Sequence, residues 1–205
     1  MSELLKALGD IDRIRQRVAE AAEFRGYGPA TIAATGTLAV AAALLQQAWF
    51  AKPLDRHAAY LALWIGTAVL SVLLVAVEML ARTRRIHTCI ANEMLHMAVE
   101  QFLPALAVGV LLTIAMVRFV STSFWMLPAL WQIVFSLGIF ASCRFLPRLV
   151  ALVGGWYLVT GLVLFSLADA RAISPWAMGL PFGVGQLLAA GALWRGAEED
   201  RDAIV

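Results

Sequence analysis

The chain has 205 residues, of which 61% are hydrophobic and 15% are charged, whereas a typical soluble domain is about 45–50% apolar and about 25% charged. The 30 charged residues cluster at the ends, with ten in residues 1–25 and six in residues 195–205. A soluble fold of this size could not bury so much apolar surface. The composition therefore excludes a soluble domain, a disordered chain and a disulfide-stapled secreted module, and it predicts a polytopic membrane protein. The net charge of +2 and the lack of a basic stripe argue against binding nucleic acid.

The first 25 residues carry five acidic and five basic side chains, too mixed for a polybasic lipid anchor. Apolar residues recur every three or four positions from Leu4 to Ala21, a spacing that predicts an amphipathic helix over residues 2–24. We expect residues 1–28, the helix and its hinge, to lie in the cytoplasm. There the helix would either cover the inner face of the bundle or dock onto a cytoplasmic partner protein or a second copy.

Six apolar stretches follow in chain order. A membrane-crossing helix needs about 20 mostly apolar residues, because the hydrocarbon layer is about 30 Å thick. The stretches that satisfy this length are 29–51, 58–81, 95–117, 123–143, 147–168 and 174–194. The ten-residue alternation of a membrane barrel does not recur. The sequence therefore predicts an all-α fold, with a six-helix transmembrane bundle over residues 29–194 and an acidic tail over residues 195–205.

The lysines and arginines predict the orientation of these helices. If the N-terminus is cytoplasmic, twelve of the 16 basic residues fall on the inner side and four on the outer side. Cytoplasmic loops of membrane proteins carry such an excess of positive charge, so we expect both termini in the cytoplasm. The abundance of arginine and alanine is typical of a GC-rich bacterial genome, which favours the bacterial inner membrane.

The spans also resemble one another. Phe102-Leu103-Pro104 begins the third span, and Phe145-Leu146-Pro147 begins the fifth. We interpret the six spans as three helical hairpins related by a parallel internal repeat. The other interpretation is that short spans rich in leucine, alanine and glycine resemble one another by composition.

In repeat-built transporters, helices interrupted by proline or glycine mark the substrate site. The fourth and sixth spans have this character, at Pro128 and Pro181 respectively. We therefore expect a ligand pathway lined by Trp131, Gln132, Gly183, Gly185 and Gln186. The alternative is close helix packing through Gly179 and Gly183, with each glutamine hydrogen-bonded to a neighbouring helix.

Ionisable residues gather near the start of the third span. Cys89, Glu93, His96 and Glu100 follow at spacings of four, three and four, so they share one helix face, and Glu78 precedes Arg82 by one turn. Three interpretations of these residues stay open. In the first, the residues form an ion-paired cytosolic face. In the second, Glu78, Glu93, His96 and Glu100 form a proton or cation relay. In the third, the residues form a site for zinc or another divalent metal.

Catalytic motifs do not stand out, since the sequence has no nucleophile triad, phosphate-binding loop or dinucleotide fingerprint. We expect no enzyme and no cofactor. The leading hypothesis is a permease or channel-like protein for a small solute or ion, in contact with the lipid bilayer and able to form a homo-oligomer. The alternative is a non-catalytic interaction or sensor protein that acts through residues 2–24. The third is a metal-binding membrane protein that uses the Cys89 to Glu100 face.

Overall fold

The computed structural model describes residues 28–49, 57–85, 89–143, 149–167 and 170–202, and the regular structure within these ranges is helical throughout. Six α-helices and two 3-10 helices follow in chain order. They are α2 (Pro29–Trp49), α3 (His57–Arg85), α4 (Cys89–Phe119), η2 (Ser121–Met126), α5 (Leu127–Ser142), α6 (Val150–Leu167), η4 (Ala170–Ile173) and α7 (Pro175–Asp202). The amphipathic helix predicted over residues 2–24 lies outside the described residues.

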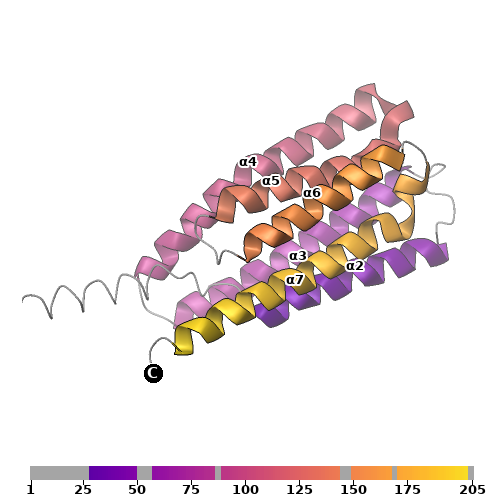
Figure 1. The fold of residues 1–205 in the computed structure, drawn as a ribbon. Helices are drawn as coiled ribbons and strands as arrows, with labels where there is room; N and C mark the ends of the chain where they lie inside the picture. The colour runs from indigo at the N-terminus through magenta and orange to yellow at the C-terminus, as the bar shows by residue number, and fades with distance from the viewer. Residues whose placement is uncertain (1–27, 50–56, 86–88, 144–148, 168–169, 203–205) are drawn as a thin grey trace, which may run out of the picture.

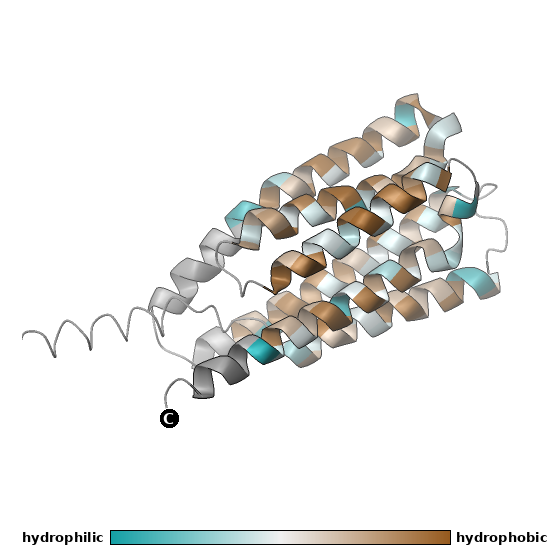
Figure 2. Ribbon diagram, viewed as in Figure 1, coloured by the Kyte–Doolittle hydropathy of each residue, from teal (hydrophilic) through white to brown (hydrophobic). Residues whose placement is uncertain are grey.

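Each of these six α-helices, α5 together with the end of η2, contains a stretch long and apolar enough to cross a membrane. Apolar residues cover most of their length (Figure 2). These stretches coincide with the six predicted ones to within a few residues, which confirms the all-helical class over the described ranges. The helices also run past the apolar limits: α4 begins at Cys89, and α7 continues through most of the acidic tail to Asp202. Both extensions contain alanine and glutamate, which favour helix.

The helices form two groups of three. Helices α2, α3 and α7 lie together, and α4, α5 and α6 lie together above them in the view of Figure 1. The most extensive contacts join α2 to α7 and α5 to α6, so the first and last helices of the described chain are neighbours. Helices α2 and α3, α4 and α5, and α6 and α7 also pack against each other.

The larger of two clusters of buried apolar side chains in the described residues lies at one end of the bundle, where η2 and η4 meet. It is a cluster of mostly large side chains from both groups: Ala42, Ala43, Tyr60, Trp64, Met116, Phe124, Leu127, Ile173 and Met178. Helices α3 and α4 are peripheral, with only 11% and 6% of their apolar stretches buried inside the protein. Their outward faces carry leucine, valine and isoleucine, as a lipid-facing surface does.

Glycines allow α2 and α7 to approach closely. A Cβ added at Gly179 would overlap the Cβ of Ala43, and one added at Gly183 would lie 2.8 Å from Cγ2 of Val40. On the α2 side, a Cβ at Gly36 would lie 3.0 Å from the Cβ of Gln186. Small residues at this spacing are how apolar helices gain van der Waals contact. Gly179 and Gly183 therefore lie in a helix–helix interface.

The two prolines expected to interrupt spans differ in their effect. Pro128 lies in the first turn of α5, after η2, where a missing N–H costs nothing. The prediction that Pro128 interrupts an α-helix was wrong, because the α-helix begins only at Leu127. Pro181, in contrast, lies inside α7 and does remove a backbone hydrogen bond from it.

Candidate functional site

Among the buried side chains of the described residues, five are large and carry a polar atom, and they are here called the polar band. They are Gln46 from α2, Tyr60 and Trp64 from α3, Gln132 from α5 and Tyr157 from α6. Tyr60, Gln132 and Tyr157 each touch a residue of the other helix group. Burying a polar group is costly unless it is hydrogen-bonded, so each member of the band calls for a physical explanation.

Gln46 joins three elements at the core end of the bundle. Its Nε2 donates to the carbonyl of Ile173 at 2.9 Å, and Nε1 of Trp64 donates to its Oε1 at 2.7 Å. The Ile173 carbonyl is available because the Ala177 N–H donates to Ser174 instead. Sequence reasoning missed Gln46. The sequence did contain a signal, because two amides are adjacent at positions 46 and 47. Adjacent helix positions do not face the same neighbour, so the two glutamines have different surroundings and one of them can be buried.

Gln132 compensates for the proline in α7. Pro181 has no N–H, so the Ala177 carbonyl four residues earlier lacks its normal helical donor. Nε2 of Gln132 donates to that carbonyl at 3.0 Å, and the Sδ of Met178 lies 3.9 Å from the same nitrogen. A side chain of α5 thus replaces a backbone donor missing from α7. The Oε1 of Gln132 is buried and has no hydrogen-bond partner among the described residues.

We expect this replacement to appear as coupling between Gln132 and Pro181. Gln132→Leu should lower the free energy of unfolding by about 0.6–1.7 kcal/mol, the range of interhelical hydrogen bonds in membrane proteins. In a Pro181→Ala background the backbone supplies its own donor to Ala177, so the same change should cost clearly less. SDS-induced unfolding of the four proteins of this cycle measures the coupling. Equal costs in both backgrounds would contradict the assigned role.

Two tyrosines of the band have buried hydroxyl groups for which the described part of the chain provides no hydrogen-bond partner. The Tyr60 ring stacks on Trp131, with centroids 6.5 Å apart and planes 11° apart, and meets Phe124 edge-on. The Tyr157 ring packs against Phe135 and Phe182, with centroids 4.9 Å and 5.1 Å away. The Tyr157 hydroxyl lies near the side chain of Gln186 without completing a hydrogen bond to it. Aromatic contacts therefore position both rings, while their hydroxyl groups stay unpaired.

The five residues predicted to line a ligand pathway take part in different contacts. Trp131 is half-buried and donates from Nε1 to Thr113 at 2.8 Å, and Gln132 is fully buried. Gly185 lies against the Tyr157 ring, with Gln186 next to it, while Gly183 faces α2. The structure brings Gly185 and Gln186 to Tyr157 and places Trp131 on Tyr60. It places Gly183 in the packing contact between α2 and α7.

The ionisable residues lie toward the other end of the bundle. Helix α4 is continuous from Cys89, so its backbone keeps positions 89, 93, 96 and 100 on one face. The side chains of Cys89, Glu93 and His96 lie outside the described residues. Glu100 is exposed and Glu78 is half-buried on α3. Among the described side chains no three His, Cys, Asp or Glu residues form a metal-binding group, and the predicted site depends on the undescribed Glu93 and His96.

The polar band thus combines satisfied amide donors with three unpaired oxygen atoms, those of Tyr60, Gln132 and Tyr157. Hydrogen bonds of Gln46 and Gln132 fix helix positions, whereas the unpaired atoms lie at contacts between the two helix groups. Comparison of the chain with protein-family models, curated proteins and solved structures finds no match.

Proposed function

We propose that this protein is a small permease or channel-like protein of the bacterial inner membrane, which passes a small polar solute or ion between its two helix groups. The observation that supports this proposal is the set of three unpaired buried oxygen atoms, on Tyr60, Gln132 and Tyr157. A buried polar atom without a partner costs about 1–3 kcal/mol. Such a cost is tolerable in a closed state if another state supplies water or solute as the partner.

In this mechanism the two groups separate at the contacts that Tyr60, Gln132 and Tyr157 make. Separation breaks the hydrogen bond from Gln132 to Ala177 and exposes the amide and both hydroxyl groups to the pathway. Helix α7 can bend at this level, because Pro181 has already removed one of its backbone hydrogen bonds. Gly185 and Gln186 then border the same opening, beside Tyr157.

The proposal keeps the predicted orientation, with both termini in the cytoplasm, and the three-hairpin repeat as the origin of the two-sided architecture. Glu78, Glu93, His96 and Glu100 would form the cytoplasmic mouth, where a negative ring attracts cations. The exposure of Glu100, at the first residue of the apolar stretch of α4, is consistent with such a position.

A non-catalytic membrane interaction protein is the second candidate. The hydrogen bonds of Gln46 and Gln132 to backbone carbonyls favour it, because they show that these amides also serve helix packing. An interaction protein would keep the polar band closed to water at all times. Access of water to the band therefore separates the two candidates.

Ser136 provides a conservative probe of this access, since it is fully buried on α5 one turn after Gln132. In a chain with Cys89 and Cys143 replaced by serine, we expect Ser136→Cys to react with a membrane-impermeant methanethiosulfonate reagent in proteoliposomes. Both native cysteines are removed because their own thiolates could be labelled.

The control is Ala107→Cys on α4, whose side chain is exposed and lies seven residues inside the apolar stretch Glu100–Phe119. It should face lipid and stay unlabelled. If Ser136→Cys is unlabelled from either side of the membrane, the pathway proposal is wrong and the interaction protein is favoured.

A further inference from the structure

Trp156 on α6 makes a hydrogen bond that crosses between the two helix groups. Its Nε1 donates to the Pro181 carbonyl of α7 at 2.9 Å, and its side chain is half-buried. Trp156 lies six residues after Val150, the first residue of α6, or about 9 Å along the helix axis. Tryptophans of membrane proteins are enriched instead at the two ends of a span. An indole N–H inside an apolar stretch needs an acceptor, and here α7 provides it.

A second hydrogen bond between the groups ends on the same part of α7. Gln132 of α5 donates to the Ala177 carbonyl at 3.0 Å, one helical turn before Pro181. The Ala177 carbonyl lacks its helical donor because proline has no N–H. A carbonyl oxygen has two lone pairs, so that of Pro181 can accept from Trp156 in addition to a donor of its own helix. Helices α5 and α6 therefore each hold α7 at a backbone carbonyl next to its proline.

Helix α7 makes its contacts with α6 and with α2 through opposite faces. Pro181 and Gly185 are four residues apart and share one face. Helix α6 contacts both, Pro181 through the Trp156 bond and Gly185 through the ring of Tyr157, which a Cβ at Gly185 would overlap. Gly183 lies midway between them in the sequence, so it faces the other way and packs against α2.

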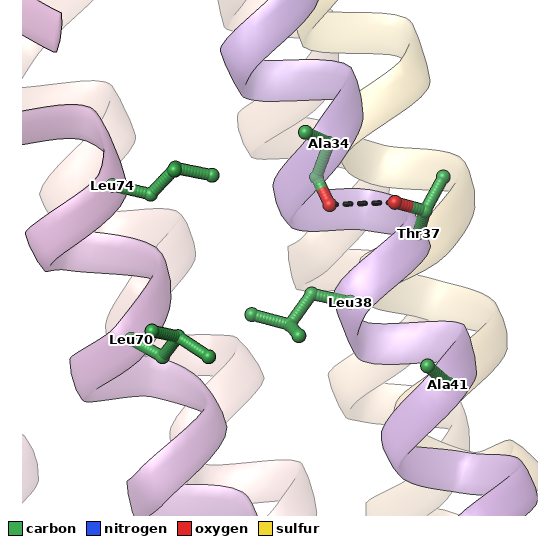
Figure 3. A pocket seen from close by; sticks show the side chains of 6 residues that line it. All are labelled: Ala34, Thr37, Leu38, Ala41, Leu70 and Leu74. Carbon is green, nitrogen blue, oxygen red and sulfur yellow. Dashed lines mark hydrogen bonds between the residues drawn. The ribbon is translucent and has the colours of Figure 1, made fainter.

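On the side of α2 toward α3, an apolar groove separates these two helices (Figure 3). It has a volume of about 420 Å³ and is lined by Ala34, Thr37, Leu38, Ala41, Leu70 and Leu74. Val40, beside Ala41, lies against Gly183 of α7. The groove therefore begins at the level of the proline segment of α7 and continues away from the core end. At this level α2 packs on α7 more closely than on α3.

The helices α2 and α7 are thus attached to the other helices at two places. At the core end Gln46 donates to Ile173 and accepts from Trp64. One or more turns farther along α7, Gln132 and Trp156 hold this helix against α5 and α6. If α7 bends at its proline while the core end stays in place, the bonds of Gln132 and Trp156 are the ones that break.

We propose that Trp156 is a positioning residue that keeps the polar band closed, because its hydrogen bond to Pro181 must break before α7 can move away from α6. This inference rests on the proposed function, and it identifies a contact that controls how often the pathway opens. Helix α2 moves together with α7, since their packing through Gly183 is unaffected. The groove between α2 and α3 leaves space for this movement.

Labelling of Ser136→Cys in proteoliposomes, in the chain without native cysteines, tests the role of Trp156. Trp156→Phe keeps an aromatic ring and removes the N–H. Because the closed state then loses a bond that the open state never had, the impermeant reagent should label Ser136→Cys about 3- to 18-fold faster, the factor that corresponds to one interhelical hydrogen bond. Trp176→Phe makes the same substitution at an exposed position of α7 and should leave the rate unchanged.

A second probe separates this role from general support of the fold. Ala172 is fully buried in η4, at the core end that stays in place during the proposed movement. In the chain without native cysteines and with Ser136 restored, Ala172→Cys should be labelled at the same rate whether residue 156 is tryptophan or phenylalanine. A general loosening of the bundle would instead accelerate labelling at both probes.

The outcomes distinguish this inference from the proposed function. If Ser136→Cys is labelled but Trp156→Phe does not accelerate the reaction, Trp156 does not control opening, and the pathway proposal stands. Equal acceleration at Ala172→Cys would also overturn the inference, because Trp156 would then support the fold as a whole. If Ser136→Cys stays unlabelled with either residue at position 156, the pathway proposal is wrong and this inference fails with it.

Discussion

Replacing Gly179 with alanine is expected to push α2 and α7 apart and to lower the free energy of unfolding by about 1–3 kcal/mol, as overpacking of a dense interface does. The added methyl group would overlap the Cβ of Ala43, with the Ala39 carbonyl 3.6 Å away. Neither atom belongs to a flexible side chain, so the overlap can be relieved only by moving a helix. SDS-induced unfolding in mixed micelles measures the loss.

Gly191 offers a control on the same helix, because nothing lies within 4 Å of a Cβ built there. Gly191→Ala should stabilise the protein by up to about 1 kcal/mol, since alanine favours helix more than glycine does. Opposite signs for Gly179→Ala and Gly191→Ala would identify the α2–α7 contact as the cause. Equal small effects would show that the two helices can adjust without cost.

The second large loss of stability is expected from Gln46→Leu. This change keeps the approximate size of the side chain but removes its bonds to Ile173 and Trp64. Both partners would remain buried without a hydrogen bond. At about 0.6–1.7 kcal/mol for each interhelical bond, the free energy of unfolding should fall by about 1–3 kcal/mol. The emission of Trp64, which is buried, should also shift when its indole N–H loses its acceptor.

Gln47→Leu is the matched control, since Gln47 is the adjacent amide and its side chain is exposed. Placing leucine there adds an apolar group to an outward face and should leave stability unchanged or slightly higher. A loss of stability from Gln47→Leu as large as that from Gln46→Leu would contradict the assignment of Gln46 as the bridging side chain.

The helices were predictable from the sequence, because a stretch of about 20 apolar residues can be recognised by its hydropathy alone. The exact ends were less so: a helix continues past its apolar part when the next residues favour helix, as α4 and α7 do. Pro128 was misjudged for a related reason, since hydropathy does not distinguish η2 from the α-helix that follows it.

The candidate site was predicted only in part. Gln132 was identified because an amide in an apolar span needs a partner, and Pro181 because a proline inside a span frees a backbone carbonyl. The contact between these two residues depends on how α5 packs against α7, and this packing cannot be predicted from a local sequence pattern. Tyr60 and Tyr157 were missed because tyrosine is common in apolar helices, and only three-dimensional packing reveals that their hydroxyl groups lack partners. Likewise, the pairing of α2 with α7 joins distant parts of the chain.

This pairing of α2 with α7, the first and last helices of the described residues, has a consequence for biogenesis. If the helices insert into a membrane during synthesis, as proposed, α2 does so long before α7 leaves the ribosome, and its small-residue face, around Gly36 and Ala43, stays unpaired until then. Until then that face is open to other helices, including those of insertion factors and neighbouring nascent chains. A chain stopped before α7 would keep this face exposed, and cellular quality control could recognise it as unfinished.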